Sequence, residues 1–398
     1  MKPFRDNNRI KARKKLKCKL LAGVVLPVLF VCITASCGRM QPETKSGLVM
    51  DTVFTVTVYG DAEITDRLLE AADQLDKTVL SRFEAGSLVS RYTQDISADG
   101  SEQISTGNDL QADTDAGNSE SSYDAEAESR YIASVYGREY DLDDIFSDCE
   151  DIRYDSAGAF DVRIGALSDL WDIKGRMTGE DKDGFPVPAQ IESLRGDRSV
   201  PDLGSVGKGI YLDLAYDILS DSNASAAVVS AGGSILVYGQ KPDGKLFRVA
   251  IRDPFPGSSS DAFATIILSG THFVSTSGSY ERFIEYNGEI YHHIIDPLSG
   301  YPAWTRDDIL NRSQISASSL SSPIPVPEHI PVSVTIISDS GFYSDALSTA
   351  CFVLGPDMGI ALAEKYSSEA IFIMDDGTVL ASHGIIFDER SNTFELAY

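Results

Sequence analysis

The sequence predicts an α+β fold in which antiparallel or mixed sheets and packed helices form one large domain. Segments with strand patterns follow one another in series, and only a few segments show helical periodicity. Strands in series with few intervening helices favour an antiparallel or mixed sheet over a doubly wound parallel one. No internal repeat is present.

The strand predictions rest on alternation of apolar and polar residues or on short apolar runs. Residues 52–59 alternate, whereas 226–229 and 234–238 are apolar runs. The remaining predicted strands are 247–252, 264–268, 273–276, 283–286, 332–338 and 370–374.

Helices are predicted where apolar residues recur every three or four positions. The segments are 64–79, 209–220 and 343–354. In the first of them one face carries only apolar residues, namely Leu68, Leu69, Ala72, Leu75 and Val79.

Residues 48–398 are predicted to hold the folded domain, interrupted by two insertions. Residues 94–129 are rich in Asp, Glu, Ser and Gly and poor in aromatic residues. Such a composition buries too little apolar surface to offset chain entropy, so we expect a disordered acidic insertion. Residues 311–331 form a second, Ser/Pro-rich insertion of the same kind. About 290 ordered residues remain, enough for one large domain or two closely joined halves.

The N-terminus has the pattern of an export signal. Residues 1–36 hold nine Lys or Arg residues, followed by an apolar run from Leu20 to Ile33 and small residues. The run is short for a helix that crosses a bilayer of ~30 Å. We therefore predict a lipoprotein signal peptide over 1–36, lipidation at Cys37, and a lipidated tether over 37–47. An ordinary cleaved signal with Cys37 as a bystander is the main alternative, and an uncleaved anchor is a further one.

Charge excludes one class of partner. The formal net charge is −26, and removal of the basic leader lowers it to about −34. Such a chain is repelled by nucleic acid. Beyond the leader and Cys37 only Cys149 and Cys351 remain, which predicts separate buried thiols rather than a disulfide framework, with pairing of the two in an oxidising compartment as the alternative.

Closely spaced glycines lie just before the predicted helix 209–220. The segment runs from Asp202 through Gly204 and Gly207 to Lys208 and Gly209. Backbone N–H groups at such a turn can approach an anion, and Lys208 adds a positive charge, so a phosphate-bearing ligand is indicated. The spacing fits neither a Walker A loop nor the dinucleotide fingerprint. A plain glycine-rich turn explains the segment equally well.

Oxygen ligands are placed one turn apart in the predicted helix 343–354. Asp345 and Thr349 are four residues apart, so both side chains point from one face. A carboxylate and a hydroxyl are the hard ligands that Mg²⁺ prefers. The alternative is that Asp345 caps the helix N-terminus.

Two histidines precede an Asp-Pro turn at residues 291–300. His293, with Asp296 nearby, could act as a base near neutral pH. Neighbouring residues of a strand face opposite ways, so only one of His292 and His293 can face a given site. A structural histidine that holds the turn is the alternative.

Two further segments are weaker indicators of a site. Phe160 beside Asp161, with Trp171 further on, would suit a flat heterocycle, although core packing explains the aromatic residues as well. Residues 276–282 are dense in hydroxyls and could line a polar pocket, or form an ordinary loop.

In this order, the segments resemble the ApbE family, the FAD:protein FMN transferases of bacterial envelopes. The resemblance covers nearly all of residues 48–376 and includes 50–52, 81–83 with 87–92, 158–161, 202–209, 231–234, 276–282, 293–300 and 345–349. It implies an α+β architecture of T-fold type, with FAD in a cleft and its pyrophosphate on a metal ion.

The resemblance also implies roles for single residues. Asp345, Thr349 and the backbone carbonyl at about Ser205 look like ligands of Mg²⁺, and His293 with Asp296 looks like the catalytic segment. Residues that look like flavin-nucleotide contacts are Met50, Phe83, Ala159, Phe160, Asp161, Asp202 and Lys208. The sequence departs from the family where Asp51 replaces a frequent Gly, where Phe83 replaces a frequent Tyr, and at Arg163.

The activity implied is Mg²⁺-dependent transfer of FMN from FAD to a Thr or Ser hydroxyl of an acceptor flavoprotein with a Ser/Thr-Gly-Ala-Thr-like segment, releasing AMP. With the leader, it implies an enzyme anchored by lipid to the outer face of the cell membrane. The alternatives are an FAD pyrophosphatase that gives FMN and AMP, and a lipoprotein that binds FAD without chemistry.

Overall fold

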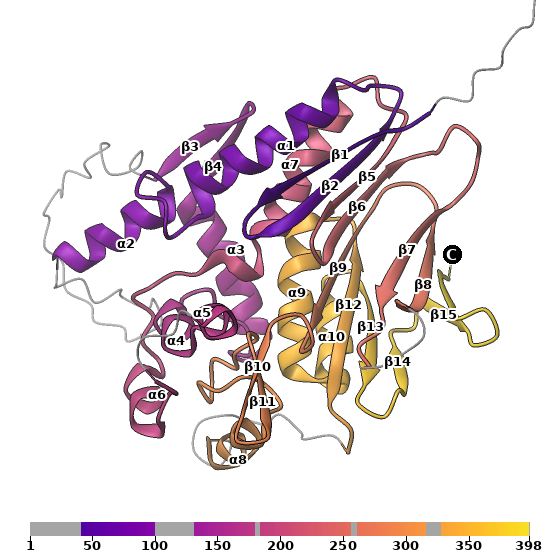
Figure 1. Cartoon of the computed structure of the whole chain (residues 1–398). Coiled ribbons are helices and arrows are strands. Elements are labelled where there is room, and N and C mark those ends of the chain that lie inside the picture. Colours follow the sequence, from indigo (N-terminus) through magenta and orange to yellow (C-terminus); the bar gives the residue numbers. More distant parts are fainter. Residues whose placement is uncertain (1–40, 100–130, 180–183, 256–260, 316–327, 398) are drawn as a thin grey trace, which may run out of the picture. The chain divides into compact units, whose positions relative to one another are not determined.

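A computed structural model of the chain describes residues 41–99, 131–179, 184–255, 261–315 and 328–397 (Figure 1). Its centre is an eight-stranded sheet in which every neighbouring pair is antiparallel. The strands, in spatial order, are β1 (Glu43–Val49), β2 (Thr52–Tyr59), β5 (Ala226–Ala231), β6 (Ser234–Gly239), β9 (His272–Gly278), β12 (Pro331–Ser338), β13 (Glu369–Met374) and β14 (Val379–Ala381).

Both faces of this sheet are buried in its middle, because successive side chains enter different cores. Leu236 and Phe273 belong to the main core on the helical face, whereas their neighbours Val237 and Val274 belong to a second core. The second core lies against a four-stranded sheet made of β15 (Ile385–Asp388), β16 (Thr393–Leu396), β8 (Ala262–Leu268) and β7 (Phe247–Arg252). Only the β16–β8 pair is parallel within that sheet.

Helices cover the other face of the large sheet, with α7 (Gly207–Ser220) and α9 (Gly341–Leu354) directly against it (Figure 1). Around them lie α1 (Ile64–Leu75) with a π-helical turn over Asp76–Leu80, α2 (Leu88–Asp99), α3 (Leu142–Asp155) and α10 (Pro356–Lys365). Shorter elements complete the fold: α4 (Gly165–Trp171), α5 (Ile173–Thr178), α6 (Pro188–Leu194), the 3₁₀ turn η2 (Leu203–Ser205), α8 (Arg306–Ile315), and the hairpins β3 (Ile132–Val135) with β4 (Arg138–Asp141) and β10 (Phe283–Tyr286) with β11 (Glu289–His292).

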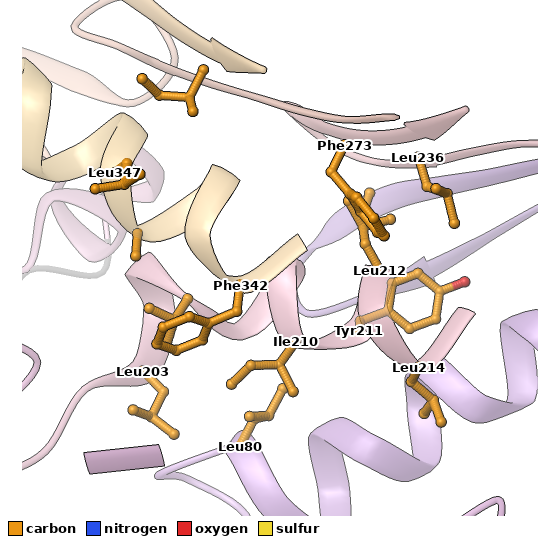
Figure 2. Packing of buried hydrophobic residues seen from close by; sticks show 14 of the residues in the cluster. Leu80, Leu203, Ile210, Tyr211, Leu212, Leu214, Leu236, Phe273, Phe342 and Leu347 are labelled. Carbon is orange, nitrogen blue, oxygen red and sulfur yellow. The ribbon is translucent and has the colours of Figure 1, made fainter. Parts of the chain in front are cut away.

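The two central helices approach each other closely where both carry glycine. A Cβ added at Gly209 would lie 2.3 Å from the carbonyl oxygen of Gly341, so only glycine fits there. The Asp213 carboxylate of α7 accepts the free N–H groups of Gly341 and Phe342 at 2.6 and 2.9 Å, which caps the N-terminus of α9. Figure 2 shows Ile210 and Phe342 packed beside this crossing with Leu80 and Leu203.

The α+β prediction is confirmed, and so is each predicted strand and helix. The strands 52–59, 247–252 and 283–286 have the predicted bounds. The first helix differs, because regular α-helix ends at Leu75 and a π-helical turn carries the chain to Leu80. Cys149 and Cys351 are separate and buried, as predicted.

Three segments that were predicted to be irregular are partly ordered. The predicted tether over 37–47 is wrong from Glu43 onward, because β1 pairs with β2 along its whole length. Residues 94–99 of the predicted disordered insertion belong to α2, and Asp95 there accepts a hydrogen bond from the Tyr131 hydroxyl at 2.8 Å. The second insertion, 311–331, is helical up to Ile315. Its last residue, Pro331, is already in β12.

The leader 1–36, Cys37 and most of the two predicted insertions lie outside the described residues. Within the described ranges, every helix is too short or too polar to cross a membrane.

Candidate active site

The site is built where α7, α9 and the large sheet meet, around the side chain of Asp345. The carboxylate is almost fully buried. Asp345 is in the second turn of α9, and Ser340 caps the helix instead, so the capping alternative for Asp345 is wrong. Its Oδ2 accepts from the Gly209 N–H at 3.0 Å and its Oδ1 from the Ser234 hydroxyl at 3.0 Å.

The ammonium of Lys208 contacts both oxygens of this carboxylate. Its Nζ lies 3.2 Å from Oδ1 and 3.3 Å from Oδ2 of Asp345, and 3.4 Å from the carbonyl oxygen of Gly204. A positive charge is thus surrounded by two carboxylate oxygens and one backbone carbonyl. The donor set is the kind that a hard divalent cation takes, so these residues fit the Mg²⁺ that the family resemblance implies.

Thr349 lies one turn beyond Asp345 on α9 and is partly exposed. Its Oγ1 is 3.4 Å from the Ser277 hydroxyl of β9, so the hydroxyl stands beside the sheet on the same side of the helix as Asp345. Ser205, the predicted carbonyl ligand, is the last residue of η2. The carbonyl that contacts Lys208 is that of its neighbour Gly204.

The turn before α7 is held by Asp202. Its Oδ1 accepts from the Gly204 N–H at 3.0 Å, and its own N–H donates to the carbonyl of Val162 at 2.6 Å. The side chain also faces the Arg82 guanidinium at 4.0 Å. The glycine segment therefore enters α7 in a fixed path beside residues 160–162, and its N–H groups lie at the N-terminus of a 14-residue helix.

The residues before Val162 are packed inside the protein. Ala159 and Phe160 are each 1% exposed and belong to the main core, and Trp171 is equally buried, as the core-packing alternative states. Asp161 is paired with Arg198, whose Nε donates to Oδ2 at 2.8 Å. Contact of these residues with a flavin stays a prediction.

Phe83 is the most exposed of the predicted flavin contacts, and Met50 is half-buried. Met50 and Asp51 form the two-residue turn between β1 and β2, with φ of 49° and 57°. Both central residues of a type I′ turn need positive φ, and Asp tolerates it better than most residues, which explains how Asp51 can stand where the family resemblance leads us to expect Gly. Phe83 is 81% exposed, with the Arg82 guanidinium 4.7 Å from its ring centre.

The adjacent histidines face different surroundings, as the strand geometry predicts. His292 is buried, and its Nε2 lies 2.8 Å from the carbonyl oxygen of Ala303, so it holds the following turn. Burial lowers its pKa to about 4. His293 is partly buried, and its pKa is lowered to about 3 by burial first and then by the neighbouring His292, Arg282 and Lys208.

Asp296 lies in a buried ion-pair cluster. Its Oδ2 is 2.9 Å from Nε of Arg312, which also pairs with Asp308 at 2.8 Å, and all three side chains are at most 3% exposed. Burial, followed by the neighbouring Asp296, raises the pKa of Asp308 to about 7. Arg312 Nη1 donates to the carbonyl of Val353 on α9 at 2.9 Å, so the cluster ties the turn after His293 to the helix that carries Asp345.

No local sequence pattern assigns a role to several residues that orient or support the site. Ser234 and Ser277 lie inside recognised segments, but their purpose depends on α9, which is distant in the chain. Asp213 and Arg312 carry no local pattern at all. Among the described residues, the one group of three His, Cys, Asp or Glu side chains that could share a metal ion is exposed: His329, Asp375 and Asp376.

Known proteins resemble this chain over most of its length. The FAD:protein FMN transferase of Haemophilus influenzae is 25% identical over 398 residues, which is 92% of this chain and 96% of that protein. The Treponema pallidum protein of the same name is 31% identical over 265 residues, 58% of this chain and 65% of that protein. The match therefore spans slightly less than two thirds of the Treponema protein.

Solved structures show the same fold. The Pseudomonas stutzeri flavinyl transferase ApbE in its apo form superposes with a TM-score of 0.57 at 24% identity, covering 86% of this chain and 95% of that one. The Thermotoga maritima ApbE protein gives a TM-score of 0.59 at 22% identity, covering 86% and 97%. The model of the ApbE family matches residues 50–326 and 323–372. The chain therefore belongs to the ApbE family.

Proposed function

We propose that the chain is a Mg²⁺-dependent enzyme that transfers FMN from FAD to a hydroxyl of an acceptor flavoprotein and releases AMP. The name of its relatives supports flavin transfer. The observation that carries the proposal is the set of oxygens around the Lys208 ammonium, formed by the Asp345 carboxylate and the Gly204 carbonyl.

Asp345, Thr349 and a carbonyl of the η2 turn would hold the ion. When bound, Mg²⁺ neutralises pyrophosphate oxygens and the charge that develops on the leaving AMP. Lys208 is placed to add a second positive charge beside the phosphates. The N-terminus of α7 lies beside the same carboxylate, since the Gly209 N–H donates to Asp345, and its partial positive charge favours a bound anion.

His293 is the proposed base for the acceptor hydroxyl. Its Nδ1 lies 3.3 Å from the carbonyl oxygen of Arg282, and a carbonyl can only accept. Nδ1 therefore carries the hydrogen, and Nε2 keeps a free lone pair that can take a proton. Burial lowers its pKa to about 3, so the imidazole is neutral at pH 7 but is a weak base, and its proposed role rests on the position of Nε2 rather than on basicity.

Asp296 is assigned a positioning role rather than that of a base. Its Oδ1 accepts from the Leu298 N–H at 3.0 Å and its Oδ2 pairs with Arg312, so the carboxylate is engaged on both sides and fully buried. These contacts favour a role in holding the turn that follows His293.

Replacement of His293 tests the assignment of the base. We expect His293→Ala to lower the transfer rate about 100-fold or more, the usual contribution of a general base, while the FAD dissociation constant stays within about threefold of wild type. His272→Ala is the control, since His272 is a partly buried histidine whose Nε2 lies 3.0 Å from the nearby carbonyl oxygen of Ser269. A full transfer rate in His293→Ala, with FAD binding unchanged, would remove His293 from the mechanism.

The membrane attachment rests on the leader and Cys37. Release of the protein from the membrane fraction in Cys37→Ala, with the signal still removed, would support lipidation at this residue. Retention of Cys37→Ala in the membrane after removal of its signal would instead point to another anchor.

A further inference from the structure

A seam of hydroxyl groups joins β9 to α9 beside the proposed metal site. Ser275 and Ser344 are 2.9 Å apart, Ser277 and Ser348 are 2.8 Å apart, and Ser277 is 3.4 Å from Thr349. A hydroxyl has one hydrogen to donate, so the directions of these hydrogen bonds can be worked out from the groups at their ends.

The direction is fixed at Ser348. Its Oγ lies 2.8 Å from the carbonyl oxygen of Asp345, and since a carbonyl only accepts, Ser348 spends its hydrogen there. In the 2.8 Å contact with Ser277, Ser348 must then accept and Ser277 must donate. Ser277 has no hydrogen left for Thr349, so Thr349 donates to Ser277.

We infer that Ser277 is a positioning residue that turns the lone pairs of Thr349 Oγ1 toward the metal ion. The hydrogen bonds run from Thr349 through Ser277 and Ser348 to the carbonyl of Asp345, and we call this series the relay. The hydroxyl hydrogen of Thr349 therefore points at β9. Both lone pairs of Thr349 Oγ1 then point away from the sheet, on the side of α9 that carries Asp345. A neutral hydroxyl binds a cation through its lone pairs, so the relay prepares Thr349 as a ligand. This inference rests on the proposed function, because it assumes that Thr349 binds the ion.

The same pattern one turn earlier supplies a matched control. Ser344 donates to the carbonyl of Gly341 at 2.8 Å, so Ser275 donates to Ser344. Both Ser275 and Ser344 are buried, and this pair of hydrogen bonds ends at the carbonyl of Gly341 without reaching a proposed ligand. Loss of the Ser275 hydroxyl therefore removes an equivalent hydrogen bond between β9 and α9 and leaves Thr349 as it is.

The experiment measures Mn²⁺ binding by electron paramagnetic resonance of the free ion, in the full chain with equimolar FAD. We expect Ser277→Ala to weaken Mn²⁺ binding about 10-fold or more, the usual effect of removing a partner of a metal ligand. Ser275→Ala should change it less than about twofold, and Ser277→Thr, which keeps the hydroxyl, should bind nearly as wild type. Thermal unfolding of each variant shows whether it is folded.

The possible outcomes separate the inference from the proposed function. If Thr349→Ala loses Mn²⁺ but Ser277→Ala binds it as wild type does, the relay is wrong and the metal site stands. Equal weakening in Ser277→Ala and Ser275→Ala assigns the effect to packing, which also overturns the relay. If Asp345→Ala and Thr349→Ala both bind Mn²⁺ like wild type, the metal site itself is wrong, and the relay with it.

Discussion

Replacing Asp345 by Asn should reduce activity far more than stability. The amide can still accept from the fixed Gly209 N–H through its oxygen, and the Ser234 hydroxyl can rotate to accept from the new NH₂ group. The substitution removes two contributions to the stability of the folded state. The hydrogen bonds no longer go to a charged group, and the ion pair with Lys208, whose side chain is 26% exposed, is lost. We therefore expect a loss of about 1–2 kcal/mol in the free energy of unfolding.

The catalytic loss follows from the missing negative ligand. A bound metal ion contributes several kcal/mol to the stabilisation of the transition state, and 2.7 kcal/mol corresponds to about 100-fold in rate. Transfer by Asp345→Asn should thus fall about 100-fold or more at saturating FAD, and a higher Mg²⁺ concentration should recover part of it. The assay follows AMP release and acceptor mass over a series of Mg²⁺ concentrations.

Asp213→Asn is the matched control because Asp213 joins the same two helices. Its carboxylate accepts two fixed backbone N–H groups, those of Gly341 and Phe342, and one amide oxygen cannot replace both oxygens. We expect a stability loss of about 1–3 kcal/mol for the unsatisfied donor, with transfer per folded molecule within about threefold of wild type. A full rate in Asp345→Asn, or an equal loss of rate in both variants, would show that the Asp345 carboxylate is not a metal ligand needed for transfer.

Three further predictions concern packing, charge and pH. Gly209→Ala should lower the free energy of unfolding by about 2 kcal/mol or more, because its Cβ would lie 2.3 Å from a carbonyl oxygen of α9. Gly86→Ala is the control, since a Cβ there meets no atom within 4 Å, and urea unfolding should show almost no change in its stability. Lys208→Met should raise the FAD dissociation constant about 10-fold by removing a positive charge from the phosphates, and an unchanged value in calorimetry would place Lys208 outside the site. Asp308, with its pKa raised to about 7 from an ordinary 3.8, makes stability fall as pH rises from about 4 to about 7. His292, with its pKa lowered to about 4, has the opposite effect, so its contribution makes stability rise as pH rises from about 4 to about 6.5. Asp308→Asn removes the opposing contribution of Asp308, and the free energy of unfolding should therefore rise more steeply with pH in the variant than in wild type. Parallel curves of unfolding free energy against pH would contradict the raised pKa of Asp308.

Strands and helices with strong periodicity could be predicted because burial is decided locally. Phe54, Val56 and Val58 alternate with half-buried residues, and each enters the main core as the pattern indicates. The predicted tether was wrong for a related reason. In β1 (Glu43–Val49) most residues are exposed or half-buried, so its composition looks like a linker, yet the I′ turn at Met50 pairs it along β2.

The site could be predicted only as far as its ligands are marked by spacing. Asp345 and Thr349 share a helix face, and Lys208 follows closely spaced glycines, so each pattern is visible within a few residues. The partners that orient them come from other parts of the chain. Ser277 lies in a strand and reaches Thr349 only because α9 packs over that strand. The hydroxyl-rich segment 276–282 indicates a polar pocket but does not identify Thr349 as the partner of Ser277.

In the proposed reaction FMN passes from FAD to a protein hydroxyl, and the mass of the acceptor reports this product. The purified full chain is mixed with FAD, Mg²⁺ and an acceptor domain that carries a Ser/Thr-Gly-Ala-Thr segment, and intact-mass spectrometry follows the acceptor while AMP is quantified. We predict one FMN phosphoester on the acceptor for each AMP released, and no product with Asp345→Asn at low Mg²⁺. Free FMN with an unmodified acceptor would show that water receives the FMN and would contradict the account.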